Sequence, residues 1–385
     1  MRLLPLLAGL LLAATAAAPA AAQVPLDPAK APALRAAAAE VLFWNQAQKD
    51  RNFRAMDKVF PTVPVAAGPR VRPLPKGRPL PLPKGEIDRF MAQTNAAGLL
   101  VLDHGRVRLE RYARGFGPTQ RWTSFSVAKS LTATLFGAAI ADGRLKLADP
   151  VTRFVPELKG SGYDGVTVEQ VLTMSSGVRW NEDYADPASD VARMFSLPTP
   201  PGEDAIVNYM KRLPREVAPG TRFHYNTGET NLAGTILARA VGQPINSYAS
   251  TRLWRRYGME ADAAWQVDER GSPIAGCCIA MRLRDYGRLG QLMVDNGAGL
   301  LGATWVDRAT RIQQPFRQPG RGYGYFWWIE PGQVRASGIF GQSIRIDRRN
   351  KLVIVALSAW PSALDPSLSA RHDAFFGRIA ASARR

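Results

Sequence analysis

The sequence has few of the residues that build the commonest metal and thiol sites. Its 385 residues include only two cysteines and three histidines. The cysteines, Cys277 and Cys278, are adjacent and cannot cross-link distant parts of a fold, so we interpret them as small core residues. The sequence has no H-E-x-x-H or C-x-x-C motif. We therefore predict neither a metal site nor a cofactor.

The sequence also lacks the layouts in which a histidine activates a serine. There is no G-x-S-x-G motif, which in many hydrolases carries the nucleophile on a sharp turn. His104 falls in a predicted turn, and neither His224 nor His372 has a plausible serine partner. A serine nucleophile in this chain would need a different base.

Acidic residues are scarce relative to basic ones, which leaves a net charge of +18. The positive charge is spread along the chain without a basic run or a nucleic-acid motif, so no specific nucleic-acid partner is predicted. We interpret the charge as a property of the surface. A polyanion-binding exported protein is an alternative, and its binding would weaken steeply with salt.

Long hydrophobic runs are confined to the start of the chain. Met1 and Arg2 precede an apolar run from Leu3 to Ala18 and an A-x-A end before Gln23. This pattern predicts a signal peptide over residues 1–22 and a periplasmic or secreted bacterial protein. An uncleaved membrane anchor is the alternative, which the alanine-rich composition of the run and the lack of a stop-transfer flank disfavour. No later run is long or apolar enough to span a bilayer.

The mature chain divides into an N-terminal segment, residues 23–85, and a large domain, residues 86–385. The N-terminal segment is expected to form a helix from Ala33 to about Met56. The proline-rich stretch from Pro61 to Lys84 is predicted to be an extended arm lying on the domain, because proline fixes φ and removes hydrogen-bond donors.

The large domain alternates between strand-like and helical regions. A short helix is predicted at 86–95, strands at 98–103 and 106–112, and four more strands between 323 and 358. Residues from about 149 to 265 are expected to form a helical insertion, and the chain ends in a helix from about Leu368 to Ala381. Strands at both ends with helices between them predict an α+β fold with one antiparallel sheet.

Ser126 and Lys129 are the first candidate catalytic pair. They precede an apolar run from Leu131 to Ile140 that predicts a buried helix, on which residues three apart share a face. Burial lowers the pKa of a lysine, and such a lysine can take the proton of a serine. The alternative is a serine that caps the helix beside a surface lysine.

Two later segments carry polar or small residues that suit a site. Tyr225 lies in a polar, aromatic turn, where a hydroxyl close to an ammonium group can relay protons and positive neighbours favour its phenolate form. Residues 336–342 contain small side chains that let the backbone approach a ligand closely. The alternatives are a tyrosine that caps a loop and an ordinary hairpin turn.

These segments, in this order, resemble the serine-reactive β-lactamase and penicillin-binding-protein superfamily, in its class C-like branch. The resemblance is greatest to the 6-aminohexanoate-dimer (nylon-oligomer) hydrolases and related esterases. It covers roughly Trp44 to the C-terminus and is most specific over Thr123 to Ala139, Met174 to Glu182 and Gly338 to Gln342. It implies a β-lactamase/transpeptidase-like fold.

The resemblance implies roles for individual residues. Ser126 matches the nucleophile, Lys129 its base and Tyr225 the proton-shuttling tyrosine, while the backbone N–H groups of Ser126 and Ile339 would form the oxyanion hole. Tyr184 resembles a tyrosine that closes over the substrate, and Trp327 would be a pocket wall. Further substrate contacts are expected from Asn226, Ser337 and Gly338.

Two departures from the family pattern narrow the activity. The third residue of the usual Y-x-N motif is Thr227, and the lysine of the K-T-G motif is replaced by Ala336. Both argue against β-lactam or D-alanyl-D-alanine substrates. The sequence thus predicts an exported serine hydrolase for a small ester or linear amide. A β-lactamase or D-Ala-D-Ala peptidase, and a non-catalytic acylation-type sensor, are the alternatives.

Overall fold

The computed structural model describes residues 27–384. The predicted signal peptide, residues 1–22, lies outside the described residues. The helices in the described part of the chain include none that is both long and apolar enough to cross a membrane.

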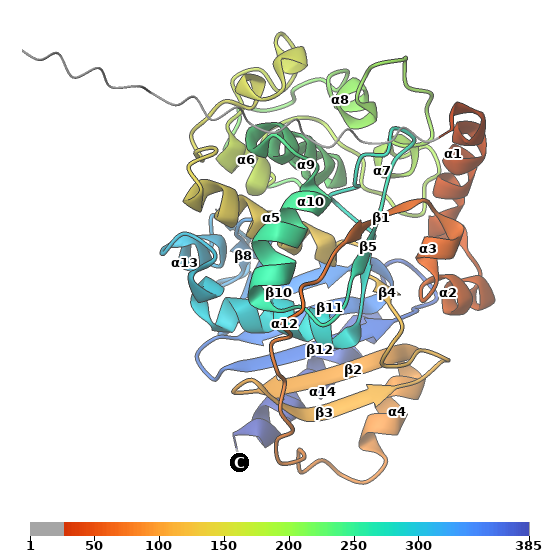
Figure 1. Cartoon of the computed structure of the whole chain (residues 1–385), viewed down its shortest axis with the longest axis vertical. Helices are drawn as coiled ribbons and strands as arrows, with labels where there is room; N and C mark the ends of the chain where they lie inside the picture. Colours follow the sequence, from red (N-terminus) through yellow and green to blue (C-terminus); the bar gives the residue numbers. More distant parts are fainter. Residues whose placement is uncertain (1–26, 385) are drawn as a thin grey trace, which may run out of the picture.

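An eight-stranded antiparallel sheet combines strands from both ends of the chain (Figure 1). Strand β2 pairs with β12, so segments that are far apart in sequence lie side by side, as predicted. The strand order is β3-β2-β12-β11-β10-β9-β8-β7. The strands span Ala96–Asp103 (β2), Arg106–Tyr112 (β3), Gln314–Pro315 (β7), Gly322–Tyr323 (β8), Trp328–Glu330 (β9), Gln333–Gly338 (β10), Gln342–Asp347 (β11) and Leu352–Ser358 (β12).

Helices cover both faces of this sheet, which gives an α+β fold. On one face, α4 (Glu86–Gln93) and α14 (Pro366–Ala383) bury an apolar cluster that includes Phe90 and Phe375, whose ring centroids are 4.0 Å apart. On the other face lie α12 (Leu283–Val294) and α5 (Val127–Ala141). Every residue of α5 from Val127 to Ala139 is buried, which explains why apolar residues occur all round this helix.

The region between the two groups of strands is mainly helical and lies above the sheet in Figure 1. Within the predicted helical insertion, a π-helical turn at Ser250–Trp254 lies between the helices α10 and α11. A second sheet of four strands, in the order β1-β5-β6-β4, was not predicted. Its strands are Thr62–Val65 (β1), Trp122–Thr123 (β4), Ala263–Gln266 (β5) and Ile279–Met281 (β6), and the helices are Val168–Leu172 (α6), Asp190–Arg193 (α7), Ala205–Met210 (α8), Thr227–Val241 (α9), Ile245–Ala249 (α10), Arg255–Tyr257 (α11) and Trp305–Ala309 (α13).

The predicted helix from Ala33 to Met56 is wrong. The chain forms α1 (Ala31–Glu40), a 3₁₀ turn, α2 (Gln46–Asn52) and α3 (Met56–Val59). The break occurs because the Asn45 side chain accepts from the backbone N–H of Gln48, whose own side chain accepts from the backbone N–H of Asn45. The proline-rich arm runs along the domain, with Gly77 donating to the carbonyl of Val107 at 2.9 Å.

The first of the four strands predicted between residues 323 and 358 is also interrupted. Tyr323 ends β8 and Trp328 begins β9, and the backbone between them turns at Phe326, which has a φ of 56°. The turn lets Ser130 of α5 donate to the Phe326 carbonyl at 2.7 Å. This contact links the edge of the large sheet to the helix that follows Ser126.

Candidate active site

Ser126 lies at the start of α5, immediately after a tight turn. Strand β4 ends at Thr123, and Ser124 anchors the chain by donating its backbone N–H to the Ile279 carbonyl at 2.9 Å. Phe125 then adopts a φ of 41°, which is rare for a residue with a bulky side chain. Ser126 is the N-terminal cap of the helix and is 8% exposed. The turn thus presents a serine hydroxyl that is mostly buried at a helix N-terminus.

Lys129 is held against Ser126 by three hydrogen bonds. Its Nζ lies 3.1 Å from Ser126 Oγ, 3.0 Å from Thr227 Oγ1 and 2.9 Å from the carbonyl oxygen of Gly276. The side chain is 1% exposed. Burial lowers the pKa of Lys129 to about 8, although the Glu182 carboxylate raises it. About a tenth of the Lys129 side chains are therefore uncharged at pH 7.

Glu182 gathers four donors beside this lysine. Its carboxylate accepts from the backbone N–H of Thr227 at 2.9 Å and from the Tyr184 hydroxyl at 2.7 Å. The Thr227 hydroxyl and the indole N–H of Trp180 donate to the same carboxylate. Glu182 thereby ties the loop that carries Tyr184 to the first turn of α9.

These contacts determine where the lone pair of a neutral Lys129 points. The Gly276 carbonyl can only accept, and the Thr227 hydroxyl gives its proton to Glu182, so both oxygens accept from Lys129. A neutral amine has two N–H groups, and these two acceptors use both. The lone pair is left for the third neighbour, Ser126, whose hydroxyl is the group to be deprotonated.

Tyr225 completes the group of polar side chains around Ser126. Its ring centroid is 5.3 Å from Lys129 Nζ, and the neighbouring Ser126 side chain acts to lower the pKa of its hydroxyl. Burial raises the pKa of Tyr225 well above its ordinary value, and the Glu182 carboxylate raises it further. The expectation that positive neighbours favour its phenolate form is therefore wrong, because Tyr225 is a neutral phenol that can donate a proton.

The end of β10 passes directly beside Ser126. A Cβ atom at Gly338 would lie 3.0 Å from the backbone nitrogen of Ser126 and 2.7 Å from the carbonyl oxygen of Ser124. Only glycine permits this close approach, as the small residues of this segment predict. It brings Ile339, whose backbone N–H is the second expected oxyanion donor, to the same cavity as Ser126.

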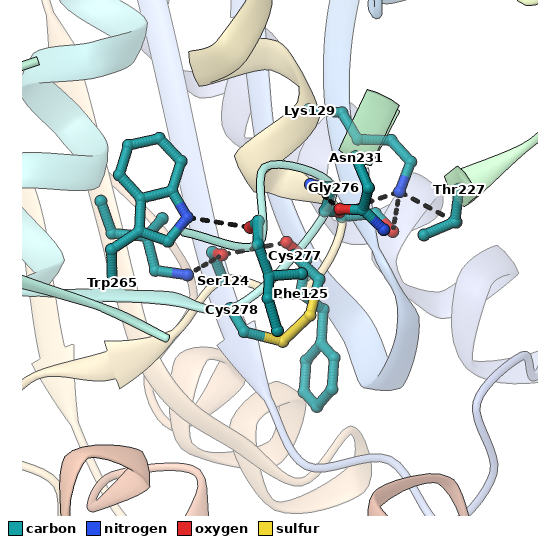
Figure 2. The surroundings of a disulfide bond; sticks show 12 residues. Ser124, Phe125, Lys129, Thr227, Asn231, Trp265, Gly276, Cys277 and Cys278 are labelled. Carbon is teal, nitrogen blue, oxygen red and sulfur yellow. Dashed lines mark hydrogen bonds between the residues drawn. A yellow bond between two sulfur atoms is a disulfide. The ribbon is translucent and has the colours of Figure 1, made fainter. Parts of the chain in front are cut away.

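A narrow cavity of about 100 Å³ opens beside Ser126. Its lining side chains that the structure describes carry no charge. Tyr184 and Thr227 supply polar atoms, and α1 with the turn after it contributes one apolar wall. Another wall is a disulfide bond between Cys277 and Cys278 (Figure 2). The lining residues are Ala38, Val41, Leu42, Phe125, Ser126, Tyr184, Val191, Ala192, Met194, Phe195, Thr227, Gln266, Ile274, Cys277, Cys278 and Ile339.

The sequence and the fold both match known serine-reactive proteins. The family model described as Beta-lactamase matches residues 84–375. A 6-aminohexanoate-dimer hydrolase from Paenarthrobacter ureafaciens is 33% identical over 87% of this chain and 91% of its own length. The chain belongs to the beta-lactamase family. The matches to hydrolases of this family identify it as a serine hydrolase.

Two further similar proteins extend the comparison. Esterase EstB from Burkholderia gladioli is 24% identical over 72% of this chain and 90% of its own. A solved structure from Bacillus anthracis, assigned as a 6-aminohexanoate-dimer hydrolase, superposes with a TM-score of 0.76 and is 22% identical. It covers 86% of this chain and 93% of its own. The β-lactamase-like fold predicted from the sequence is thus confirmed.

Not all of the residues expected from the beta-lactamase family resemblance reach the cavity. Asn226 is buried and caps α9, where its side-chain oxygen accepts from the backbone N–H of Glu229 at 2.9 Å. Trp327 is fully buried in the core, and neither it nor Asn226 lines the cavity beside Ser126. Ser337 is half-buried on β10, two residues before Ile339. The cysteines interpreted as small core residues are instead joined to each other at the cavity wall.

Three functional groups of this beta-lactamase-family site were not assigned from the sequence. Thr227 occupies the third position of the family's Y-x-N motif. Because a hydroxyl can replace an amide as a hydrogen-bond acceptor, this position could have identified Thr227 from the sequence. Glu182 lies in the motif after Trp180, but the contact that gives it a role, with Thr227, comes from another segment. Gly276 acts through its backbone carbonyl, and a backbone atom gives no signal in a sequence.

The described part of the chain does not bring three or more histidine, cysteine, aspartate or glutamate side chains together where they would hold a metal ion. The polar atoms around Ser126 are hydroxyls, one amine, one carboxylate and backbone carbonyls. Such a set is suited to moving protons at a serine nucleophile.

Proposed function

We propose that this serine hydrolase cleaves a small ester or a linear amide through an acyl-enzyme on Ser126. The observation that carries the proposal is the 3.1 Å contact between Lys129 Nζ and Ser126 Oγ, made by a buried lysine with a pKa of about 8. Removing the serine proton is the step that makes its hydroxyl nucleophilic. The contacts to Gly276 and Thr227 support this role because they direct the lysine lone pair to Ser126.

Acylation would proceed as Lys129 takes the Ser126 proton and Oγ attacks the substrate carbonyl carbon. The negative oxygen that develops would accept from the backbone N–H groups of Ser126 and Ile339. The neutral Tyr225 phenol, which lies beside Lys129, would donate a proton to the departing alkoxide or amine and recover it from Lys129. This leaves the acyl group esterified to Ser126 Oγ and every side chain near the site in its starting charge state.

Deacylation would use the same groups in the reverse order. A water molecule takes the place of the leaving group, gives a proton to the Lys129 and Tyr225 pair, and attacks the acyl carbon. The tetrahedral intermediate then collapses, and Ser126 Oγ leaves with a proton returned from that pair. The product is a carboxylic acid and free enzyme.

The substrate class is argued from the cavity and from the relatives. The described cavity lining carries no positive side chain, and the K-T-G lysine is replaced by Ala336, which is fully buried. A substrate carboxylate, as in a β-lactam, therefore has no cationic partner in this cavity. The names of the relatives, a 6-aminohexanoate-dimer hydrolase and an esterase, support amide and ester bonds as the targets.

The location of the protein is part of the proposal. Residues 1–22 have the pattern of a cleaved signal peptide, so we expect the mature chain to begin at Gln23 in the periplasm or outside the cell. Intact-mass analysis of the protein recovered from the periplasmic fraction of its bacterial host tests this expectation. A full-length mass, found only in the cytoplasm or membrane, would contradict it.

The experiment that tests the chemistry compares wild type with Ser126→Ala on p-nitrophenyl butyrate, on a linear amide and on a chromogenic cephalosporin. Wild type is expected to turn over the ester, with Ser126→Ala reduced by at least about 10³-fold. Ser367→Ala, at an exposed serine on α14, is the matched control and should match wild type. A stoichiometric burst with a lasting mass adduct would indicate a sensor. Faster cleavage of the cephalosporin than of the ester and the amide would indicate a β-lactamase. Equal activity of wild type and Ser126→Ala would exclude Ser126 as the nucleophile.

A further inference from the structure

The disulfide bond between Cys277 and Cys278 forms part of the cavity wall next to the nucleophile. The two cysteines belong to the loop that connects β5 to β6, directly after Gly276, whose carbonyl accepts from Lys129 at 2.9 Å. Cys278 is buried and Cys277 is half-buried, and both line the same cavity as Ser126. Figure 2 shows the disulfide beside Phe125, the residue that precedes Ser126.

The backbone on either side of the disulfide is firmly anchored. Gly276 donates its N–H to Asn231 Oδ1 at 2.7 Å, and the Ala275 carbonyl accepts from the Thr132 hydroxyl at 2.9 Å. After the pair, the Cys278 carbonyl accepts from the Gln266 N–H at 3.0 Å. Because the main chain is held from three directions, a change at the sulfur atoms cannot be absorbed by moving the whole loop.

The part of the cavity that this disulfide faces is small and apolar. The whole cavity has a volume of about 100 Å³, and the walls of this part include Val41, Leu42 and Ile339. An uncharged chain of a few carbon atoms suits such a space, because a charged group would lose its hydration without finding a partner. Moving one atom of such a wall changes the length of the substrate chain that fits in the cavity.

We infer that the Cys277–Cys278 disulfide determines which acyl chains the enzyme accepts, and that its reduction narrows the acyl pocket. The inference rests on the proposed function, since the acyl group in question is the one held on Ser126. Bonded sulfur atoms lie closer together than unbonded atoms can approach. Once the bond is broken on an anchored backbone, at least one thiol must turn into the cavity.

The reduction itself requires only a two-electron reductant. A water-soluble trialkylphosphine breaks the sulfur–sulfur bond, each sulfur leaves as a thiol, and phosphorus is oxidised to the phosphine oxide with its oxygen taken from water. An exported protein would encounter an oxidising compartment, where the disulfide form persists. The wide pocket would therefore be the form that operates outside the cytoplasm.

The test measures kcat/KM for p-nitrophenyl acetate, butyrate and hexanoate with three samples. These are oxidised wild type, wild type reduced with the phosphine and freed of it by gel filtration under nitrogen, and the double variant Cys277→Ala/Cys278→Ala. Alkylation of a denatured aliquot and intact-mass analysis count the thiols, with none expected before reduction and two after. Melting curves confirm that each sample is folded.

Reduction should lower the ratio of hexanoate to acetate activity by about tenfold or more, since one methylene group is worth that much in a tight pocket. The double alanine variant, which has no sulfur atoms, should change the ratio in the opposite direction, and the phosphine should not affect it. An unchanged ratio, or an equal loss on all three esters, overturns the inference and leaves the proposed function intact. If no Ser126-dependent turnover is found, and a phosphonate reagent forms no adduct with Ser126, both the inference and the proposed function are overturned.

Discussion

The Thr227 hydroxyl donates its proton to the Glu182 carboxylate and, with its oxygen, accepts a hydrogen bond from Lys129 at 3.0 Å. A hydroxyl has one proton, so its donation to Glu182 leaves only acceptor capacity toward the lysine. Glu182 thereby sets the direction of the Lys129 lone pair without touching Lys129 or Ser126. Glu182 is therefore a positioning residue. It acts through the direction of the hydrogen bonds around Lys129 as well as through its charge.

Glu182→Gln should lower kcat for ester hydrolysis by at least about tenfold while the protein remains folded. The glutamine amide can donate to the Thr227 oxygen and turn the threonine proton toward Lys129, which misdirects the lysine lone pair. Glu203→Gln, at an exposed carboxylate that pairs with Lys211, is the matched control. The measurement is kcat and KM for p-nitrophenyl butyrate, with melting curves for both variants. Equal kcat in Glu182→Gln and wild type would remove Glu182 from the mechanism.

Thr227→Val and Thr227→Ser separate the shape of this side chain from its oxygen. Valine leaves one N–H of the buried Lys129 without an acceptor, so kcat/KM should fall by about 10²-fold or more. Serine keeps the oxygen, and activity within a few-fold of wild type is expected. The assay is ester turnover at constant pH. Similar losses in both variants would mean that packing, and not the hydroxyl, accounts for the effect.

Activity should rise with pH through the pKa of Lys129, which burial lowers to about 8. Only the unprotonated amine can take the Ser126 proton, and its fraction increases with pH. The value of kcat/KM should therefore climb about tenfold per pH unit below pH 7 and level off above pH 9. Because the Glu182 carboxylate raises this pKa, Glu182→Gln should move the midpoint to lower pH. A flat profile of kcat/KM between pH 6 and pH 9 would argue against Lys129 as the base.

Local patterns in the sequence predicted the part of the site that is built within one helix. The three-residue spacing of Ser126 and Lys129 and the apolar run after them specify a buried helix with both side chains on one face, and α5 has this form. The strands near both ends of the chain were predicted from alternation and turn residues. Their pairing in one sheet followed from the arrangement of strands around a helical region.

Contacts between distant segments were beyond the reach of those patterns. Glu182 acquires its role from Thr227, which lies 45 residues later in the chain. The wall formed by Val41 and Leu42 depends on a helix break that the Asn45 capping box imposes within the segment predicted as one helix. The two adjacent cysteines were interpreted as core residues. A disulfide bond between neighbours links no distant segments, so the sequence pattern gave no sign of it.

Gly338→Ala should abolish or strongly reduce activity by displacing the backbone around Ser126. A Cβ atom at this position would meet the Ser124 carbonyl oxygen at 2.7 Å and the Ser126 nitrogen at 3.0 Å, and neither is a flexible side-chain end. The loss should appear mainly in kcat, because the Ser126 N–H is the expected oxyanion donor. Gly377→Ala is the control, since its Cβ atom would meet nothing within 4 Å on α14. Full activity in Gly338→Ala would show that strand β10 can shift to accommodate the Cβ atom without displacing Ser126.

Glu229→Gln should make the stability of the protein less dependent on pH. Burial raises the pKa of Glu229 to about 8, while hydrogen bonds from Ser176 and Tyr163 act in the opposite direction. The ordinary pKa of glutamate is 4.5, so between pH 4.5 and pH 8 the folded state holds a proton that the unfolded state has lost. The stabilising contribution of that proton is complete below pH 4.5 and is lost as the pH rises through 8.

The free energy of unfolding of wild type should therefore fall by about 1 to 3 kcal/mol more than that of Glu229→Gln between pH 5 and pH 9. Urea denaturation of both proteins at each pH gives this difference, and groups common to the two chains cancel. Glu216→Gln, at an exposed carboxylate paired with Arg222, should follow the wild-type curve. Parallel curves for wild type and Glu229→Gln would mean that Glu229 is ionised in the folded core, with its charge stabilised by Ser176 and Tyr163.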